Sequence, residues 1–123
     1  MNQVSSYHPF ADLAVDGKRS EVENIADLGG LSAAFDAYRA TLGDKAADTG
    51  YVRRLDREFF IGFAQSWRAM SNEAALRKQA NGDHAPERYR VATVRNLDAW
   101  YDAFDVRPGQ LLYLEPSARV RIW

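Results

Sequence analysis

Two carboxylates, Glu23 and Asp27, lie four residues apart in the segment Glu-Asn-Ile-Ala-Asp. On a helix this spacing places both side chains on one face, one turn apart. Two like charges there repel each other, and a cation bound beside them would reverse that effect. The spacing is common, however, and acidic residues in a first turn also suit the helix dipole. Taken alone, the pair therefore predicts an ordinary helix turn.

A glycine pair, Gly29-Gly30, follows the second carboxylate inside an otherwise periodic helical pattern. Each glycine costs about 1 kcal/mol relative to alanine in a helix interior. Two interpretations stay open. Either a neighbouring element approaches the backbone closely at this point, or the helix breaks and a separate helix starts near Ser32.

The eight residues from Glu23 to Gly30 resemble the ENIAD-x-G-G signature of the neprilysin and endothelin-converting-enzyme family of zinc metalloendopeptidases. The resemblance implies that Glu23 is the third zinc ligand. It also implies that Asp27 accepts a hydrogen bond from a zinc-bound histidine and fixes the orientation of that ring.

A second segment resembles the FFxxFAQxW helix of the same family, with Phe59-Phe60 at its start and Trp67 at its end. Most of these aromatic residues are predicted to belong to a core. Trp67 is the exception, because the resemblance implies that it lies near the pocket for the side chain after the scissile bond.

A third segment, His84-Ala85-Pro86 with Arg90, is similar to the family's HSPxxxR segment. The resemblance implies that His84 donates a hydrogen bond to the oxyanion of the tetrahedral intermediate. It implies that Arg90 binds a backbone carbonyl of a peptide substrate. The resemblance covers residues 15–123, and the last residues are similar to the family's Arg-Val-Trp ending.

The chain departs from the family pattern most clearly in having no His-Glu-x-x-His motif. That motif supplies two histidine ligands and the glutamate that activates water, and catalytic zinc needs three protein ligands. We therefore expect this chain alone to bind zinc weakly or not at all and to hydrolyse no peptides.

Smaller departures surround the site residues. Arg19 and Glu21 stand where the family has apolar residues, and Gly82 stands where it often has an acid, although Asp83 is adjacent. The residue that orients His84 is therefore left unassigned. His8 has no matching role in the family and is predicted to be a surface residue.

The elements that must position these residues are predicted to be mainly α-helical within a single domain, residues 1–123. Apolar periodicity predicts helices over 22–42 and 54–80, the latter with one apolar stripe formed by Leu55, Phe59, Phe63, Trp67 and Met70. Residues 1–20 read as irregular and 89–94 as extended or a single turn. Asn96 is predicted to cap a helix through Phe104, and Trp123 to dock into a core. The resemblance implies the C-terminal helical part of a thermolysin-like (zincin) catalytic domain.

The bulk composition excludes several function classes. A net charge of −1 argues against nucleic acid or an anionic membrane as partner, and the absence of cysteine excludes disulfides and thiol chemistry. No apolar run approaches the roughly 18 residues of a membrane span, and the first residues do not resemble a signal peptide. The resemblance implies an extracellular or periplasmic location, whereas a chain complete as given would be cytoplasmic.

Two hypotheses about function remain. The chain is part of a zinc metalloendopeptidase that acts on peptides, or it is a stand-alone non-catalytic module that binds a peptide or a partner. An unrelated helical interaction domain is a weaker third hypothesis, because four motifs occur in the family's order. The first two predict an exposed apolar face near Gly29-Gly30, covered by the absent part of the catalytic domain or by self-association. An in-frame HExxH upstream of Met1 would favour the first.

Overall fold

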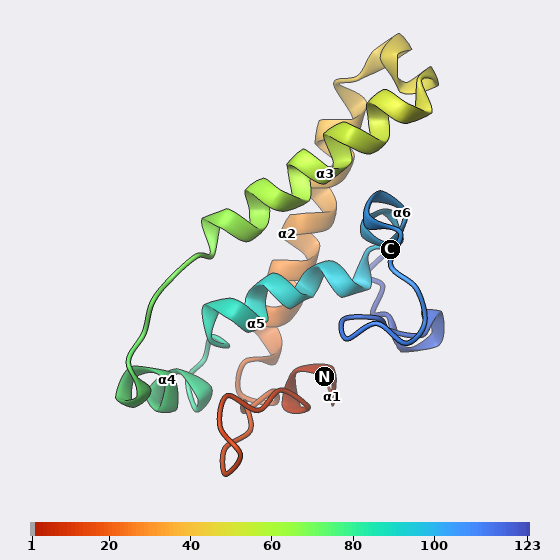
Figure 1. Ribbon diagram of the computed structural model, residues 1–123. Helices are drawn as coiled ribbons and strands as arrows, with labels where there is room; N and C mark the ends of the chain where they lie inside the picture. The colour runs from red at the N-terminus through yellow and green to blue at the C-terminus, as the bar shows by residue number, and fades with distance from the viewer. Residues whose placement is uncertain (1) are drawn as a thin grey trace.

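The computed structural model describes residues 2–123 and is mainly helical, as predicted (Figure 1). The helical elements are α1 (Asn2–Ser5), α2 (Glu21–Ala40), η1 (Gly43–Ala47), α3 (Thr49–Ser66), α4 (Glu73–Ala80), α5 (Glu87–Val91), η2 (Ala92–Asn96), α6 (Asp98–Phe104) and η3 (Pro116–Ala118). Within this range no β-strand forms, and one isolated bridge joins Phe10 and Leu13. None of the described helices combines the length and the apolar character needed to cross a membrane.

Stacked aromatic rings join α2 to α3 and form the centre of the main core. The rings of Phe35 and Phe60 stack with their centroids 5.3 Å apart, and those of Tyr38 and Phe59 stack at 5.2 Å. Trp100 of α6 packs against the same cluster and is 9% exposed. Figure 1 shows α2 and α3 close together near their upper ends and diverging below, with α6 to the right. The prediction that most aromatic residues of the FFxxFAQxW segment belong to the core is confirmed for Phe59 and Phe60.

A buried polar cluster lies beside these rings. Asp56 is 4% exposed and accepts hydrogen bonds from the Tyr38 hydroxyl at 2.8 Å and from Arg39 Nη2 at 3.0 Å. Burial, together with the hydrogen bond to the Asp56 carboxylate, raises the pKa of Tyr38 to about 12. The cluster therefore satisfies its buried carboxylate internally.

Helix α2 runs without interruption through Gly29-Gly30, so the interpretation that the helix breaks there is wrong. Leu28 and Leu31, at 2% and 4% exposure, anchor this stretch on the core side. A Cβ atom on Gly29 would lie 3.6 Å from Ile122 Cδ1, an ordinary contact, and one on Gly30 would meet nothing within 4 Å. The described residues therefore give no steric reason for either glycine.

The single helix predicted over 54–80 is wrong, because the structure has two helices with a non-helical linker between Ser66 and Glu73. Asn72 caps α4, and its side chain accepts a hydrogen bond from the Ala75 backbone N–H at 2.9 Å. This cap chemistry favours a new helix start over continuation. Met70 consequently lies in the linker and is fully exposed, so the predicted apolar stripe does not extend to it.

Of the two alternatives predicted for residues 89–94, the extended one is wrong, because the segment belongs to the short helices α5 and η2. Two further predictions nearer the C-terminus are also wrong. Asn96 does not cap α6, because its 7% exposed side chain bonds instead to Gln3 and to the Val120 N–H. Trp123 does not dock into a core and is 72% exposed. Ion pairs from Arg119 and Arg121 to Asp98 hold the tail in its place.

Candidate active site

The first half of α2 presents the two carboxylates that the sequence singled out. Glu23 and Asp27 lie one turn apart on the same face, as their spacing predicted. Their side chains differ in exposure, at 43% for Glu23 and 14% for Asp27. Glu23 is therefore accessible from solvent, whereas Asp27 lies deeper against the neighbouring elements.

The loop between α4 and α5 brings His84 to the first of these carboxylates. His84 Nε2 lies 3.1 Å from Glu23 Oε2, and the imidazole is 54% exposed. The two residues that follow it, Ala85 and Pro86, are buried, with Ala85 packed against Val4 and Val15. A buried anchor thus precedes α5, while the histidine side chain stays at the surface beside α2.

The second carboxylate, Asp27, is held by Arg90 of α5. Arg90 Nε and Nη2 donate to the two Asp27 oxygens at 2.7 Å and 2.6 Å, a bidentate pair. The Asp27 carboxylate raises the pKa of the Arg90 guanidinium, chiefly through this hydrogen bonding. Arg90 also lies over the Trp67 ring, with its guanidinium carbon 4.0 Å from the ring centroid, a cation–π contact.

The structure thus brings all the predicted site residues into one row, with two contact groups joined by one turn of α2. The row runs from His84 to Glu23, then one turn along α2 to Asp27, and on through Arg90 to Trp67. His8 is exposed, as predicted, and bonds to the Ser6 carbonyl through Nδ1 at 3.0 Å.

The sequence did not identify the pairing between Arg19 and Asp83. Arg19 Nε donates to Asp83 Oδ1 at 2.7 Å, and the Arg19 guanidinium holds the pKa of Asp83 below its usual range. Arg19 had been noted as a departure from the family pattern, and Asp83 as the acid adjacent to the departure at Gly82. Their complementary charges were the only signal, because they are 64 positions apart.

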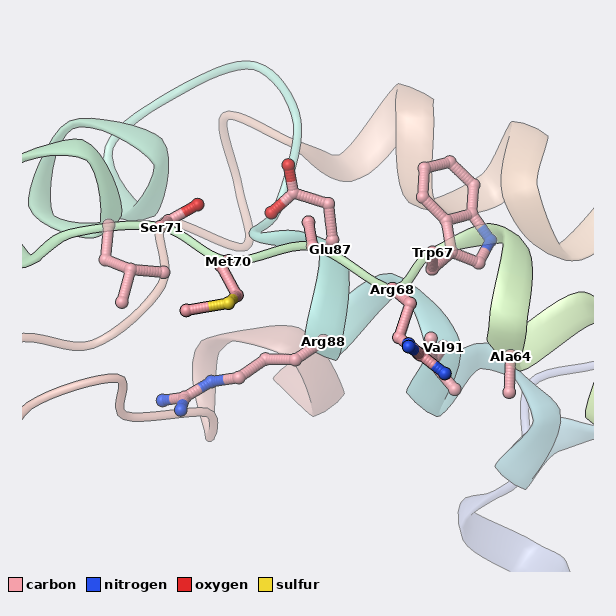
Figure 2. Close-up of a pocket in the computed structure, with 10 residues that line it drawn as sticks. Ala64, Trp67, Arg68, Met70, Ser71, Glu87, Arg88 and Val91 are labelled. Carbon is pink, nitrogen blue, oxygen red and sulfur yellow. The ribbon is translucent and has the colours of Figure 1, made fainter.

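A pocket of about 470 Å³ opens beside Trp67, between the linker and α5 (Figure 2). Its lining includes Met70, Leu76, Glu87, Arg88 and Val91. Figure 2 shows Glu87 and Arg88 projecting from α5, with Met70 and Ser71 on the linker opposite. The sequence could not predict this pocket, because it depends on the linker that had been taken as helix.

The residues present do not make a complete zinc site. Across residues 2–123 no group of three or more histidine, cysteine, aspartate or glutamate side chains is arranged to hold a metal ion. Glu23 has the chemistry of one zinc ligand, and His84 is its nearest ionisable partner. A catalytic zinc ion needs three protein ligands, so further ligands would have to come from outside this chain.

Comparison with known proteins shows the family to which the chain belongs. The model of Peptidase family M13 matches residues 1–120, so the chain belongs to this family. The match begins earlier than residue 15, where the resemblance had been placed.

Similar curated proteins carry names from the same family. The chain is 32% identical to Neprilysin-3 of Drosophila melanogaster over 89% of its length. It is 33% identical to the neutral endopeptidase of Lactobacillus helveticus over 93%, and 40% identical to human endothelin-converting enzyme-like 1 over 89%. It spans only 14%, 16% and 14% of these three relatives respectively. No solved structure gives a significant match.

Proposed function

We propose that this chain forms part of the catalytic site of a zinc metalloendopeptidase. Membership of Peptidase family M13 supports a peptidase, and the row of contacts from His84 to Trp67 supports the site residues. The observation that carries the proposal is the bidentate Asp27–Arg90 pair, because it ties the carboxylate face of α2 to the arginine proposed to bind substrate.

In this proposal Glu23 provides one zinc ligand, and two more ligands come from outside these 123 residues. A zinc ion held there would supply positive charge that polarises the carbonyl of the scissile bond. In the structure Glu23 is paired with His84, so Glu23 would have to leave this contact in order to serve as a zinc ligand. Both side chains are about half exposed, so little packing opposes this change.

The remaining residues bind and orient. His84, once released from Glu23, donates a hydrogen bond to the oxyanion that develops on the substrate carbonyl. Arg90 has donors beyond the two that it gives to Asp27, and one of them binds a substrate backbone carbonyl. Two hydrogen bonds to Asp27 fix the orientation of the Arg90 guanidinium, and the Trp67 ring packs against the guanidinium.

A chimera tests this proposal. The matching segment of the Lactobacillus helveticus neutral endopeptidase is replaced by this chain, and zinc content and peptide cleavage are measured. We expect cleavage, loss of both tightly held zinc and cleavage in Glu23→Gln, and neither loss in the exposed control Glu58→Gln. His84→Gln is expected to keep zinc and to lower kcat by about 10²–10³-fold.

Other outcomes would count against specific parts of the proposal. Tightly held zinc in Glu23→Gln would exclude Glu23 as a ligand. A folded, zinc-loaded chimera without cleavage would favour the alternative function, a non-catalytic module that binds a peptide or partner. The 123-residue chain alone is expected to bind zinc weakly and to cleave nothing. Stoichiometric, tightly held zinc in that chain would contradict this expectation.

A further inference from the structure

Two ion pairs, side by side, connect the loop that carries His84 to the start of α2. Arg19 Nε contacts Asp83 Oδ1 at 2.7 Å, and Glu23 Oε2 contacts His84 Nε2 at 3.1 Å. Arg19 and Glu23 are four residues apart, and Asp83 and His84 are adjacent. The two contacts therefore form neighbouring cross-links between the same two segments.

Without the first cross-link, His84 would have weak support. The ends of its loop are fixed, because Ala80 is fully buried and accepts a hydrogen bond from the Asp16 N–H, while Ala85 is 5% exposed. Between them, Asp83 and His84 are exposed. Both ion pairs are solvent-exposed, with side chains between 43% and 70% exposed, so either one alone contributes little. The imidazole is therefore restrained by the two contacts acting together on a loop whose ends are fixed.

Arg19 is well placed to supply the missing constraint, because its own backbone is held in a tight turn. The Arg19 N–H donates to Asp16 Oδ1 at 2.9 Å. Ser20, the next residue, is fully buried and bonds to the Asp16 carbonyl at 2.9 Å. The Arg19 guanidinium therefore extends to Asp83 from a backbone that is held in place.

The opposite side of the cross-link is also constrained. A Cβ atom added at Gly82 would lie 3.2 Å from the Gln79 carbonyl oxygen, tighter than ordinary contact. The Gly82 N–H donates to the same carbonyl at 2.9 Å. The backbone immediately before Asp83 is thus packed closely onto the end of α4, which restricts the directions that the Asp83 carboxylate can take.

We propose that Arg19 is a positioning residue for His84: its ion pair with Asp83 holds the 81–86 loop against the start of α2, so that the imidazole stays beside this face of α2 whether or not Glu23 keeps its contact with it. The role of His84 rests on the function proposed above, but its position does not. Arg19 acts through Asp83 and the loop and touches no substrate.

The test measures the position of the His84 ring by NMR in the 123-residue chain. The observable is the cross-peak between the ring Hε1 of His84 and the side-chain protons of Glu23, with exposed His8 as the internal reference. Arg19→Gln and Asp83→Asn are each expected to lose this cross-peak and to move the His84 ring signals toward those of His8. Arg19→Lys, which keeps the positive charge, is expected to retain most of its intensity.

A matched control uses Arg54, whose ion pair with Glu58 has the same 2.7 Å length and a similar exposure. Arg54→Gln is expected to leave the cross-peak unchanged. A cross-peak that persists in both Arg19→Gln and Asp83→Asn would overturn the proposal. A loss accompanied by a lower melting temperature and a collapsed amide spectrum would overturn it too, because Arg19 would then be structural. The readout needs neither zinc nor cleavage, so an inactive chimera would not affect it.

Discussion

The two halves of α2 differ in how much apolar surface they bury. In the second half, Leu31 and Phe35 are 4% and 8% exposed and pack into the aromatic core. In the first half Leu28 is buried, but Val22 and Ile25 on the same continuous helix are 76% and 43% exposed. Helix propensity cannot explain this difference, because most helical stability comes from tertiary packing. The packing of the second half therefore stabilises α2, and the first half of the same helix carries site residues.

The largest effect is expected where α3 packs on the second half of α2, here called the core half. Phe60 is 2% exposed and stacks on Phe35, so Phe60→Ala is expected to lower the free energy of unfolding by about 3–5 kcal/mol. Urea denaturation followed by circular dichroism measures the loss.

The adjacent residue, Ile61, provides the control for Phe60. It lies on the outer side of α3 and is 46% exposed, so Ile61→Ala is expected to change stability by no more than about 0.5 kcal/mol. Equal losses in the two variants would mean that the aromatic cluster does not hold α2 and α3 together.

The packing of this core half was the part best predicted from the sequence. The aromatic residues on α2 and α3 recur at helical spacing, and that pattern is local. Predictions were wrong where the outcome depended on distant partners. Asn96 was expected to cap α6 but bonds to Gln3, which is 93 positions away. The tail was expected to dock through Trp123, yet Asp98 holds it through two arginines.

A smaller loss is expected when the paired polar residues of the first half are changed. Asp27 and Arg90 are 14% and 18% exposed, so Asp27→Ala leaves a poorly solvated guanidinium without its carboxylate. The expected loss is about 1.5–3 kcal/mol, the range for hydrogen bonds to charged groups. Thermal or urea unfolding measures it, and the exposed Asp36 on the same helix gives the control Asp36→Ala. A loss no greater than that of the control would show that the Asp27–Arg90 pair does not stabilise the first half of α2.

The residues of the candidate site were named from motifs, but their contacts could not be. Spacing placed Glu23 and Asp27 on one face of a helix, and this geometry is confirmed. Nothing local indicated that Asp27 would pair with Arg90, 63 positions away, or that Arg90 would lie over Trp67. The Arg19–Asp83 pair was missed for the same reason, since each residue alone resembles an ordinary surface charge.

The smallest effect on stability is expected at the exposed apolar residues in and near the first half of α2, here called the open face: Val22, Ile25, Ile122 and Trp123. All four side chains are 40% exposed or more, and Ile122 and Trp123 lie near Gly29. That they form the continuous apolar face expected near Gly29-Gly30 stays a prediction. Val22→Ser is therefore expected to change the free energy of unfolding by less than about 0.5 kcal/mol. It is nevertheless expected to weaken self-association, because exposed apolar patches favour it.

Sedimentation velocity over a range of concentrations measures this association, with Ile61→Ser as the control outside the face. The two halves of α2 would then differ in their response. Phe60→Ala, at the core half, lowers stability without changing association, whereas Val22→Ser, in the first half, weakens association with little change in stability. A chain that stays monomeric at every concentration would show that the open face does not drive self-association. A large loss of stability in Val22→Ser would mean that Val22 is packed, and it would contradict the difference between the two halves of α2.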